Sequence, residues 1–176
     1  MDRDSFEQLM NIHGNSIYGF CYSLTMNKDL AEDLYQETML KAFEVRDRIN
    51  ERENPRSFII SIAIGKWRNL KRKEARRMRI TPLAEYDENK EVDLQSKEDP
   101  DKGLLHREQR ELLDKIFGRM EDKYKIPMVL YYKEKYDLET IAKVCNKPKG
   151  TIKSRLHKGR EIVREELKKE GYFYGG

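Results

Sequence analysis

One stretch decides the fold of this chain: DLETIAKVC-NKPKG-TIKSRLHKGR, which runs from Asp137 to Arg160. Asp137 is a residue type that caps helices, and the apolar residues after it predict a short helix from Leu138 to about Cys145. The segment from Asn146 to Gly150 predicts a tight turn, and a longer cationic helix follows, with Gly171 as its stop. This order of elements predicts a helix-turn-helix.

The second helix of this motif separates into an apolar and a cationic side. Ile152, Leu156 and Val163 are spaced to face partner helices. The side chains left for the outside are hydrogen-bond donors: Lys149, Lys153, Ser154, Arg155, His157 and Lys158. Donors at the start of such a helix suit the major groove of DNA, where guanine offers acceptors and phosphates flank the groove. The alternative is a cationic helix that is merely solvated.

Two amphipathic helices are predicted before the motif. The apolar positions of the first are Leu105, Leu112, Leu113, Ile116, Phe117 and Met120. The second runs through Met128 to Tyr132, and a start near Lys123 or Tyr124 would place Pro127 where proline is tolerated.

Charge is distributed unevenly along the rest of the chain. From Lys66 to Arg79 there are eight basic residues against one acid, a density that favours polyanion binding. From Glu85 to Asp101 there are eight acids against two lysines and no apolar periodicity, which predicts a linker. The chain therefore divides into two lobes, residues 1–81 and 104–176, joined by a flexible acidic linker over 82–103.

The N-terminal lobe is predicted to contain three helices. The first has one apolar face, formed by Phe6, Leu9, Met10, His13, Ile17, Phe20, Cys21 and Leu24. The second, capped by Asn27 or Asp29, runs to about Arg46, with inward positions at Leu30, Ala31, Leu34, Ala42, Phe43 and Val45. Its other side carries a polar stripe, Asp33, Gln36, Glu37, Lys41 and Glu44, which taken alone indicates a solvated face.

The third helix begins at Asn54-Pro55, an N-cap followed by a proline, and Pro82 is its latest possible end. It opens with apolar residues on all sides (Phe58, Ile59, Ile60, Ile62, Ala63 and Ile64), which predicts the central helix of the lobe, and then turns basic after Trp67. A polar loop precedes it. Neither lobe shows strand alternation, so the predicted fold class is all-α with two small helical domains.

Several function classes are disfavoured by composition. Charged residues make up 39% of the chain, and no apolar run approaches the length of a membrane span. The acidic N-terminus does not resemble an export signal, so we expect a cytoplasmic protein without direct membrane insertion. Cys21 and Cys145 lack metal-ligand spacing and are predicted core residues. No nucleotide-binding glycine loop, metal cluster or nucleophile–base pair is evident, so we expect no cofactor, no metal and no enzymatic activity.

Two segments resemble the extracytoplasmic-function sigma factors, the two-domain group of the sigma-70 family that serves bacterial RNA polymerase. Asp29-Leu-Ala-Glu-Asp-Leu-Tyr-Gln-Glu-Thr38 resembles the region 2.2 signature of that family. The segment from Pro148 to Arg160 resembles its region 4.2 recognition helix. The resemblance implies that residues 1–81 form region 2 and residues 104–176 form region 4.

The resemblance also implies roles for individual residues. The polar stripe then becomes the docking surface for the β′ coiled coil of core RNA polymerase, through Asp33, Gln36, Glu37 and Lys41. The residues implied at the -10 element, which region 2 melts and reads, are Arg52, Asn54, Lys66, Trp67, Asn69, Arg72 and Lys73. The residues implied at the -35 element are Lys149, Thr151, Lys153, Ser154, Arg155, His157 and Lys158. Trp67 fits either of two roles, stacking on an exposed base or anchoring the core. Gly65 stands where the family often has asparagine.

The implied partners are core polymerase, through its β′ coiled coil and β flap, promoter DNA, and an anti-sigma factor that is often membrane-anchored. Two other hypotheses remain at this point. One is a polymerase-independent helix-turn-helix regulator that senses a signal through its N-terminal lobe. The other is a metal-dependent nucleic-acid-processing enzyme, for which Asp29, Asp33 and Glu37 share one helix face at the spacing i, i+4 and i+8.

Overall fold

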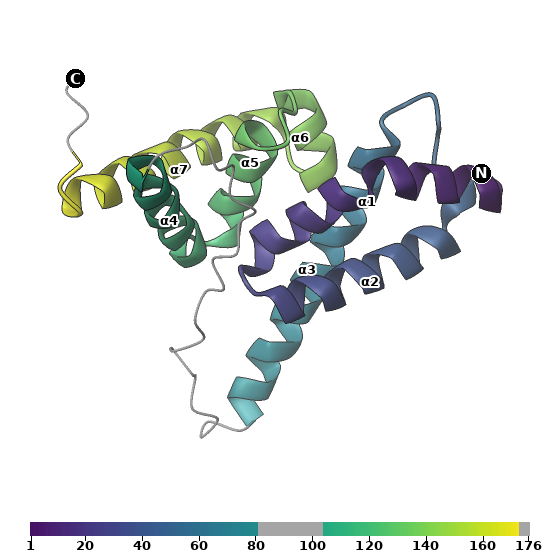
Figure 1. Ribbon diagram of the computed structural model, residues 1–176, viewed down its shortest axis with the longest axis horizontal. Helices are drawn as coiled ribbons and strands as arrows, with labels where there is room; N and C mark the ends of the chain where they lie inside the picture. The colour runs from purple at the N-terminus through teal and green to yellow at the C-terminus, as the bar shows by residue number, and fades with distance from the viewer. Residues whose placement is uncertain (81–103, 173–176) are drawn as a thin grey trace. The chain divides into compact units, whose positions relative to one another are not determined.

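The computed structural model describes residues 1–80 and 104–172, with no account of the side chains of Leu104 and Leu105. The predicted acidic linker over 82–103 lies outside the described residues. The chain divides into two compact units, Met1–Asp93 and Leu94–Gly176, which are described separately below. All regular structure in the described part of the chain is helical (Figure 1), which confirms the predicted all-α fold class.

The first unit consists of α1 (Arg3–Thr25), α2 (Lys28–Glu44), a short 3-10 helix η1 (Arg46–Arg48) and α3 (Pro55–Ile80). Each α-helix begins at a side-chain cap, as short polar residues at these positions predict. Ser5 N–H donates to Asp2 Oδ1 at 2.8 Å, and Leu30 N–H donates to Asn27 Oδ1 at 3.0 Å. Asn54 caps α3 in the same way, because Ser57 N–H donates to its Oδ1 at 3.0 Å. The predicted starts of the second and third helices are therefore confirmed.

The core of this unit forms where the apolar faces of the three helices meet. The predicted face of α1 is buried at Phe6, Leu9, Ile17, Phe20, Cys21 and Leu24, while Met10 and His13 are half-buried. The start of α3 contributes fully buried side chains at Ile59, Ile60, Ala63 and Ile64, which confirms α3 as the central helix. The predicted inward position of Phe43 is confirmed only in part: its ring packs edge-on against buried Phe6, with 5.5 Å between centroids, but 39% of the residue is exposed. Ile49, in the loop predicted to be polar, is buried instead.

The second unit consists of α4 (Leu104–Arg119), α5 (Asp122–Tyr132), α6 (Leu138–Cys145) and α7 (Lys149–Lys169). Helix α5 lies at its centre, since every residue from Lys125 to Leu130 is buried. The Lys125 ammonium reaches the Asp122 carboxylate at 3.5 Å, which keeps this buried charge paired. Because α5 begins at Asp122, Pro127 lies inside the helix and not in its first turn, contrary to the predicted start.

A glycine allows α7 to approach α5 closely. Gly159 is buried, and a Cβ atom added to it would lie 2.7 Å from Met128 Cγ. No real Cβ atom tolerates that distance without a shift of its neighbour. The absence of a side chain at Gly159 thus sets the packing of the basic helix against the centre of the unit.

Candidate nucleic-acid interface

Helices α6 and α7 form the predicted helix-turn-helix. Asp137 caps α6, with Thr140 N–H donating to its Oδ1 at 2.8 Å, and hydrogen bonds from the Thr140 side chain and backbone lower the pKa of the Asp137 carboxyl. Asn146 ends α6 in the left-handed conformation, at φ 52° and ψ 51°, where asparagine is better tolerated than most residues. Helix α7 begins at Lys149, so Lys149 and Gly150 belong to the helix and not to the turn that the sequence predicted.

The two sides of α7 match the sequence prediction. Ile152 and Leu156 are buried against the rest of the unit, and Val163 is half-buried. The exposed candidate residues are Lys149, Lys153, Ser154, His157 and Lys158. Thr151 and Arg155 are half-buried and flank that surface. The helix therefore presents a row of cationic and hydroxyl donors beside the turn.

One acid lies next to this row, and the sequence analysis gave it no role. Glu161 Oε1 lies 3.3 Å from His157 Nε2, and Glu161 Oε2 lies 3.4 Å from Lys158 Nζ. The i, i+4 and i, i+3 spacings were visible in the sequence. They could have shown that this carboxylate reaches two of the candidate readers.

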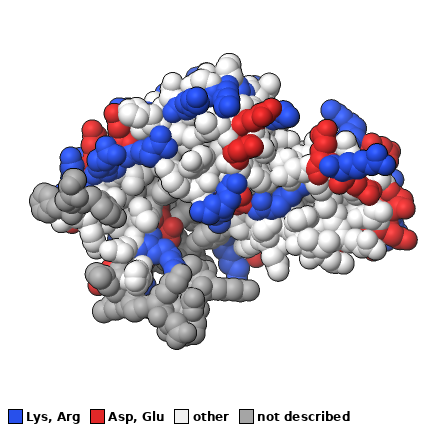
Figure 2. All heavy atoms as spheres, turned by 90° about the horizontal axis from the view of Figure 1, so that it is seen from above, with Lys and Arg blue, Asp and Glu red and all other residues white. Residues whose placement is uncertain are grey.

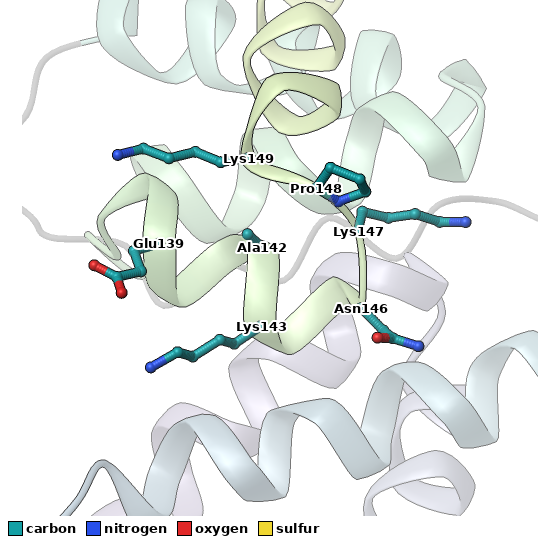
Figure 3. Close-up of a pocket in the computed structure, with 7 residues that line it drawn as sticks. All are labelled: Glu139, Ala142, Lys143, Asn146, Lys147, Pro148 and Lys149. Atoms are coloured by element: carbon teal, nitrogen blue, oxygen red, sulfur yellow. The ribbon is translucent and has the colours of Figure 1, made fainter.

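The turn between α6 and α7 forms a shallow hollow of about 420 Å³ (Figure 3). Its lining combines three lysines with one acid: Glu139, Ala142, Lys143, Asn146, Lys147, Pro148 and Lys149. In Figure 3, Lys143 and Lys149 project to one side of the turn with Glu139, and Lys147 projects to the other. Lys143 and Lys147 were not among the predicted site residues, although both lie within six residues of Lys149. Lys143 extends the cationic surface from α7 onto α6, and Lys147 adds a positive charge on the other side of the turn.

The distal half of α3 forms a second cationic surface, in the first unit. Every residue from Lys71 to Ile80 is exposed, and Figure 1 shows this end of the helix extending past α2. Among the predicted residues, Arg52, Asn54, Asn69, Arg72 and Lys73 are exposed and Lys66 is half-buried. No side chain approaches the position of a Cβ at Gly65, which is exposed.

Trp67 differs from its neighbours on α3 because only 5% of it is exposed. The Lys71 ammonium lies 5.0 Å from the centre of its ring, at a cation–π distance. Of the two roles considered for Trp67, this burial favours an anchor in the core over a platform for a base.

The polar stripe of α2 is solvent-exposed along its whole length, at Asp33, Gln36, Glu37, Lys41 and Glu44. Three of its members form ion pairs, Lys41 with Glu44 at 3.0 Å and Glu37 with Lys66 of α3 at 3.7 Å. Leu40 lies within the stripe and is 67% exposed, although the sequence analysis passed over it. Its position three residues after Glu37 and four before Glu44 could have shown that the stripe has an apolar centre.

Charge on the face seen in Figure 2 is mixed, with Asp and Glu interspersed among Lys and Arg. Among the described residues, no group of three or more His, Cys, Asp or Glu side chains is placed to hold a metal ion, and no helix is long and apolar enough to cross a membrane.

Comparisons with known proteins agree with this division into two units. A family model described as Sigma-70 region 2 matches residues 9–77, and one described as Sigma-70, region 4 matches residues 110–163. The ECF RNA polymerase sigma factor SigW of Bacillus subtilis is 26% identical over 170 residues, covering 95% of this chain and 91% of the relative. The RNA polymerase sigma factor SigV of the same organism is 29% identical over 159 residues, covering 90% and 88%.

The fold also resembles solved structures. The sigma factor RpoE of Bartonella quintana, determined in complex with the anti-sigma factor NepR, superimposes with a TM-score of 0.73 at 22% identity, covering 93% of this chain and 97% of that one. CnrH in complex with the cytosolic domain of CnrY gives a TM-score of 0.67 at 15% identity, covering 96% and 90%. These likenesses confirm the fold that the resemblance implied.

Proposed function

The chain belongs to the sigma-70 family as an extracytoplasmic-function sigma factor, a class that acts in transcription initiation, and on that premise we propose that it binds core RNA polymerase and directs it to promoters with separate -35 and -10 elements. In this proposal residues 1–81 act as region 2, residues 104–176 act as region 4, and the intervening segment joins them. Bond formation stays with the polymerase, because the chain's own role is recognition.

The -35 element is read by α7. The observation that carries this part is the row of exposed donors, Lys149, Lys153, Ser154, His157 and Lys158, held at the start of a helix whose other side is buried. Thr151 and Arg155 contribute at its edge. Recognition helices place such residues against base edges, while the first helix of the motif crosses the phosphate backbone. In this proposal Lys143, which lines the hollow beside Lys149, supplies charge for those phosphates.

The polar stripe of α2 docks on the β′ coiled coil. Its support is the combination of the exposed residues Asp33, Gln36, Glu37 and Lys41 with the exposed Leu40. Protein interfaces gain most of their affinity from a few well-buried side chains surrounded by polar ones. An isolated leucine at the centre of a polar stripe has this arrangement once a partner covers it.

The -10 element is opened and held by the basic part of α3 together with Arg52 and Asn54. The exposed side chains of Asn69, Arg72 and Lys73, with Lys66 beside them, supply charge for the phosphates of the separated strands. Trp67 acts in this proposal by fixing α3 to the core, so that the basic end keeps its direction. Docking on the β flap by the second unit completes the complex.

An anti-sigma factor is a further proposed partner. The sigma factor RpoE, whose fold this chain shares, was determined with such a protein bound. We also propose that the protein acts in the cytoplasm, because its proposed partners, core polymerase and promoter DNA, are located there.

Run-off transcription tests the proposal. Purified chain and core polymerase are combined with a genomic fragment library, and transcripts are mapped. Defined start sites that depend on both components support the proposal, whereas no association with core polymerase, or no directed initiation, contradicts it. A gel shift separates the rival regulator, which would bind its duplex tightly without core polymerase.

A further inference from the structure

A carboxylate sits among the candidate DNA-reading side chains of α7. From Lys149 to Arg160 this helix carries five lysines and arginines and no acid, and Glu161 is the first acid that follows. Its two oxygens lie 3.3 Å from His157 Nε2 and 3.4 Å from Lys158 Nζ. One carboxylate thus bridges two residues proposed to contact the -35 element.

These contacts are exposed and therefore weak. The side chains of His157, Lys158 and Glu161 are 73%, 52% and 40% exposed, respectively. Exposed pairs of this kind form and break easily in water. DNA phosphates therefore compete with Glu161 for both partners and can displace it.

A displaced carboxylate stays close to the DNA. It is fixed to the same helical turn as the side chains that bind, within the Debye length of about 8 Å at physiological salt, so it repels phosphates. This repulsion acts on DNA of any sequence. It can be offset only where the carboxylate meets a donor, and the base donors of the major groove are the amino groups of cytosine and adenine.

We propose that Glu161 is a specificity-determining residue of the recognition helix, which restrains His157 and Lys158 from binding the phosphates of arbitrary DNA. The inference rests on the proposed reading of the -35 element by α7. Non-specific binding is almost entirely electrostatic, so the carboxylate weakens it directly. At a promoter the helix sits in one register, where a base amino group facing Glu161 compensates for the repulsion.

The test compares Glu161→Gln with Glu166→Gln in the full chain. Glu166 is a matched control because it also pairs with a lysine at i+3, Lys169, at 2.8 Å, but beyond the proposed DNA-reading residues. Binding to a random-sequence duplex is measured by fluorescence anisotropy at several salt concentrations. We expect Glu161→Gln to bind roughly threefold to tenfold more tightly than the wild type, with a steeper salt dependence, and Glu166→Gln to bind like the wild type.

A second measurement uses the chain bound to core polymerase. Run-off transcript yield is measured from a mapped promoter and from the same template with a scrambled -35 element. We expect the ratio of the two yields to be lower for Glu161→Gln than for the wild type, and unchanged for Glu166→Gln. The inference is overturned if the two variants give equal ratios, or if Glu161→Gln binds random DNA no more tightly than Glu166→Gln. Failure of the wild type to initiate at any promoter would instead contradict the proposed function.

A third measurement asks whether Glu161 acts through its partner. In a Lys158→Met background, Glu161→Gln should tighten binding to random DNA by a smaller factor than in the wild type. If Glu161→Gln tightens binding by the same factor in both backgrounds, Glu161 does not act by restraining Lys158. Circular dichroism of all variants checks that α7 remains helical.

Discussion

The Lys66 ammonium lies 3.7 Å from a Glu37 carboxylate oxygen, which joins the basic helix α3 to the polar stripe of α2. The two side chains are 33% and 61% exposed, so the pair adds at most about 1 kcal/mol to the stability of the unit. Its importance lies in position: the surface proposed for polymerase and the surface proposed for -10 DNA meet at these two residues.

The first prediction concerns the stripe. Asp33→Ala combined with Glu37→Ala should weaken binding to core polymerase without unfolding the lobe, because both side chains are exposed. Pull-down with core polymerase and circular dichroism measure the two properties. Glu7→Ala is the control, since Glu7 is exposed on α1 and is not part of the stripe. Equal loss of binding in the control would remove the stripe from the interface.

The second prediction separates the exposed leucine of α2 from a buried one. Leu40→Ala should lower affinity for core polymerase by about tenfold, as truncation of an interface centre does, with little change in the free energy of unfolding. Leu34→Ala, at a residue only 2% exposed, should instead destabilise the first unit by about 2 to 5 kcal/mol. Calorimetric titration with core polymerase and chemical denaturation distinguish these outcomes. Unchanged polymerase affinity in Leu40→Ala would place Leu40 outside the contact.

The third prediction concerns base reading by α7. Lys153→Ala should reduce discrimination between promoter and scrambled -35 sequences by about 1 to 3 kcal/mol if the side chain pairs with a base edge. Polymerase binding should stay intact. Lys168→Ala, exposed in the last turn of the same helix, is the control. A uniform loss on all sequences would assign Lys153 to a phosphate contact.

The fourth prediction concerns the approach of α7 to α5. Gly159→Ala should destabilise the second unit by about 1 to 3 kcal/mol, because the new Cβ would lie 2.7 Å from Met128 Cγ. Gly150→Ala is the control on the same helix, since nothing lies within 4 Å of a Cβ there. Hydrogen exchange of the α5 and α7 amides reports the difference. Similar protection in both variants would show that Met128 moves aside at no cost.

The fifth prediction concerns pH. Burial raises the pKa of the Asp114 carboxyl in α4, against the opposing effect of Lys133 and Arg110. An acid whose folded pKa is raised binds its proton more tightly in the folded state, so it contributes stability at low pH that is lost as the pH rises from about 4 through the folded pKa. Asp114→Asn should therefore stabilise the second unit at neutral pH and flatten its dependence on pH above about 4, as measured by hydrogen exchange. Glu108→Gln, exposed on the same helix, should have neither effect.

Much of the fold could be predicted because its helix ends are encoded locally. Asn27, Asn54 and Asp137 cap the helices that they were expected to cap, since a cap needs only its own side chain and the next three residues. The errors arose where contacts distant in sequence decide. Phe43 is partly exposed despite its apolar type, and Pro127 lies within α5 because burial on all sides of that helix outweighs the missing N–H.

The site was predictable in part for the same reason. The donors of α7 follow from helical periodicity, and Asn146 and Pro148 mark the turn. The exposure of Leu40, the burial of Trp67 and the hollow lined by Lys143 depend on how helices pack, which periodicity does not specify. The i, i+3 and i, i+4 spacings could have predicted that Glu161 pairs with Lys158 and His157. They do not predict the distances between the charged atoms.

The ten exposed residues at the end of α3 have a consequence for how this protein can evolve. Side chains that do not pack in the core can be replaced with little loss of folding stability. Selection on mutations in this segment therefore acts almost entirely on function. On the role proposed for this segment at -10 DNA, promoter strength can be tuned in small steps along it, while the rest of the unit stays under the separate constraint of remaining folded.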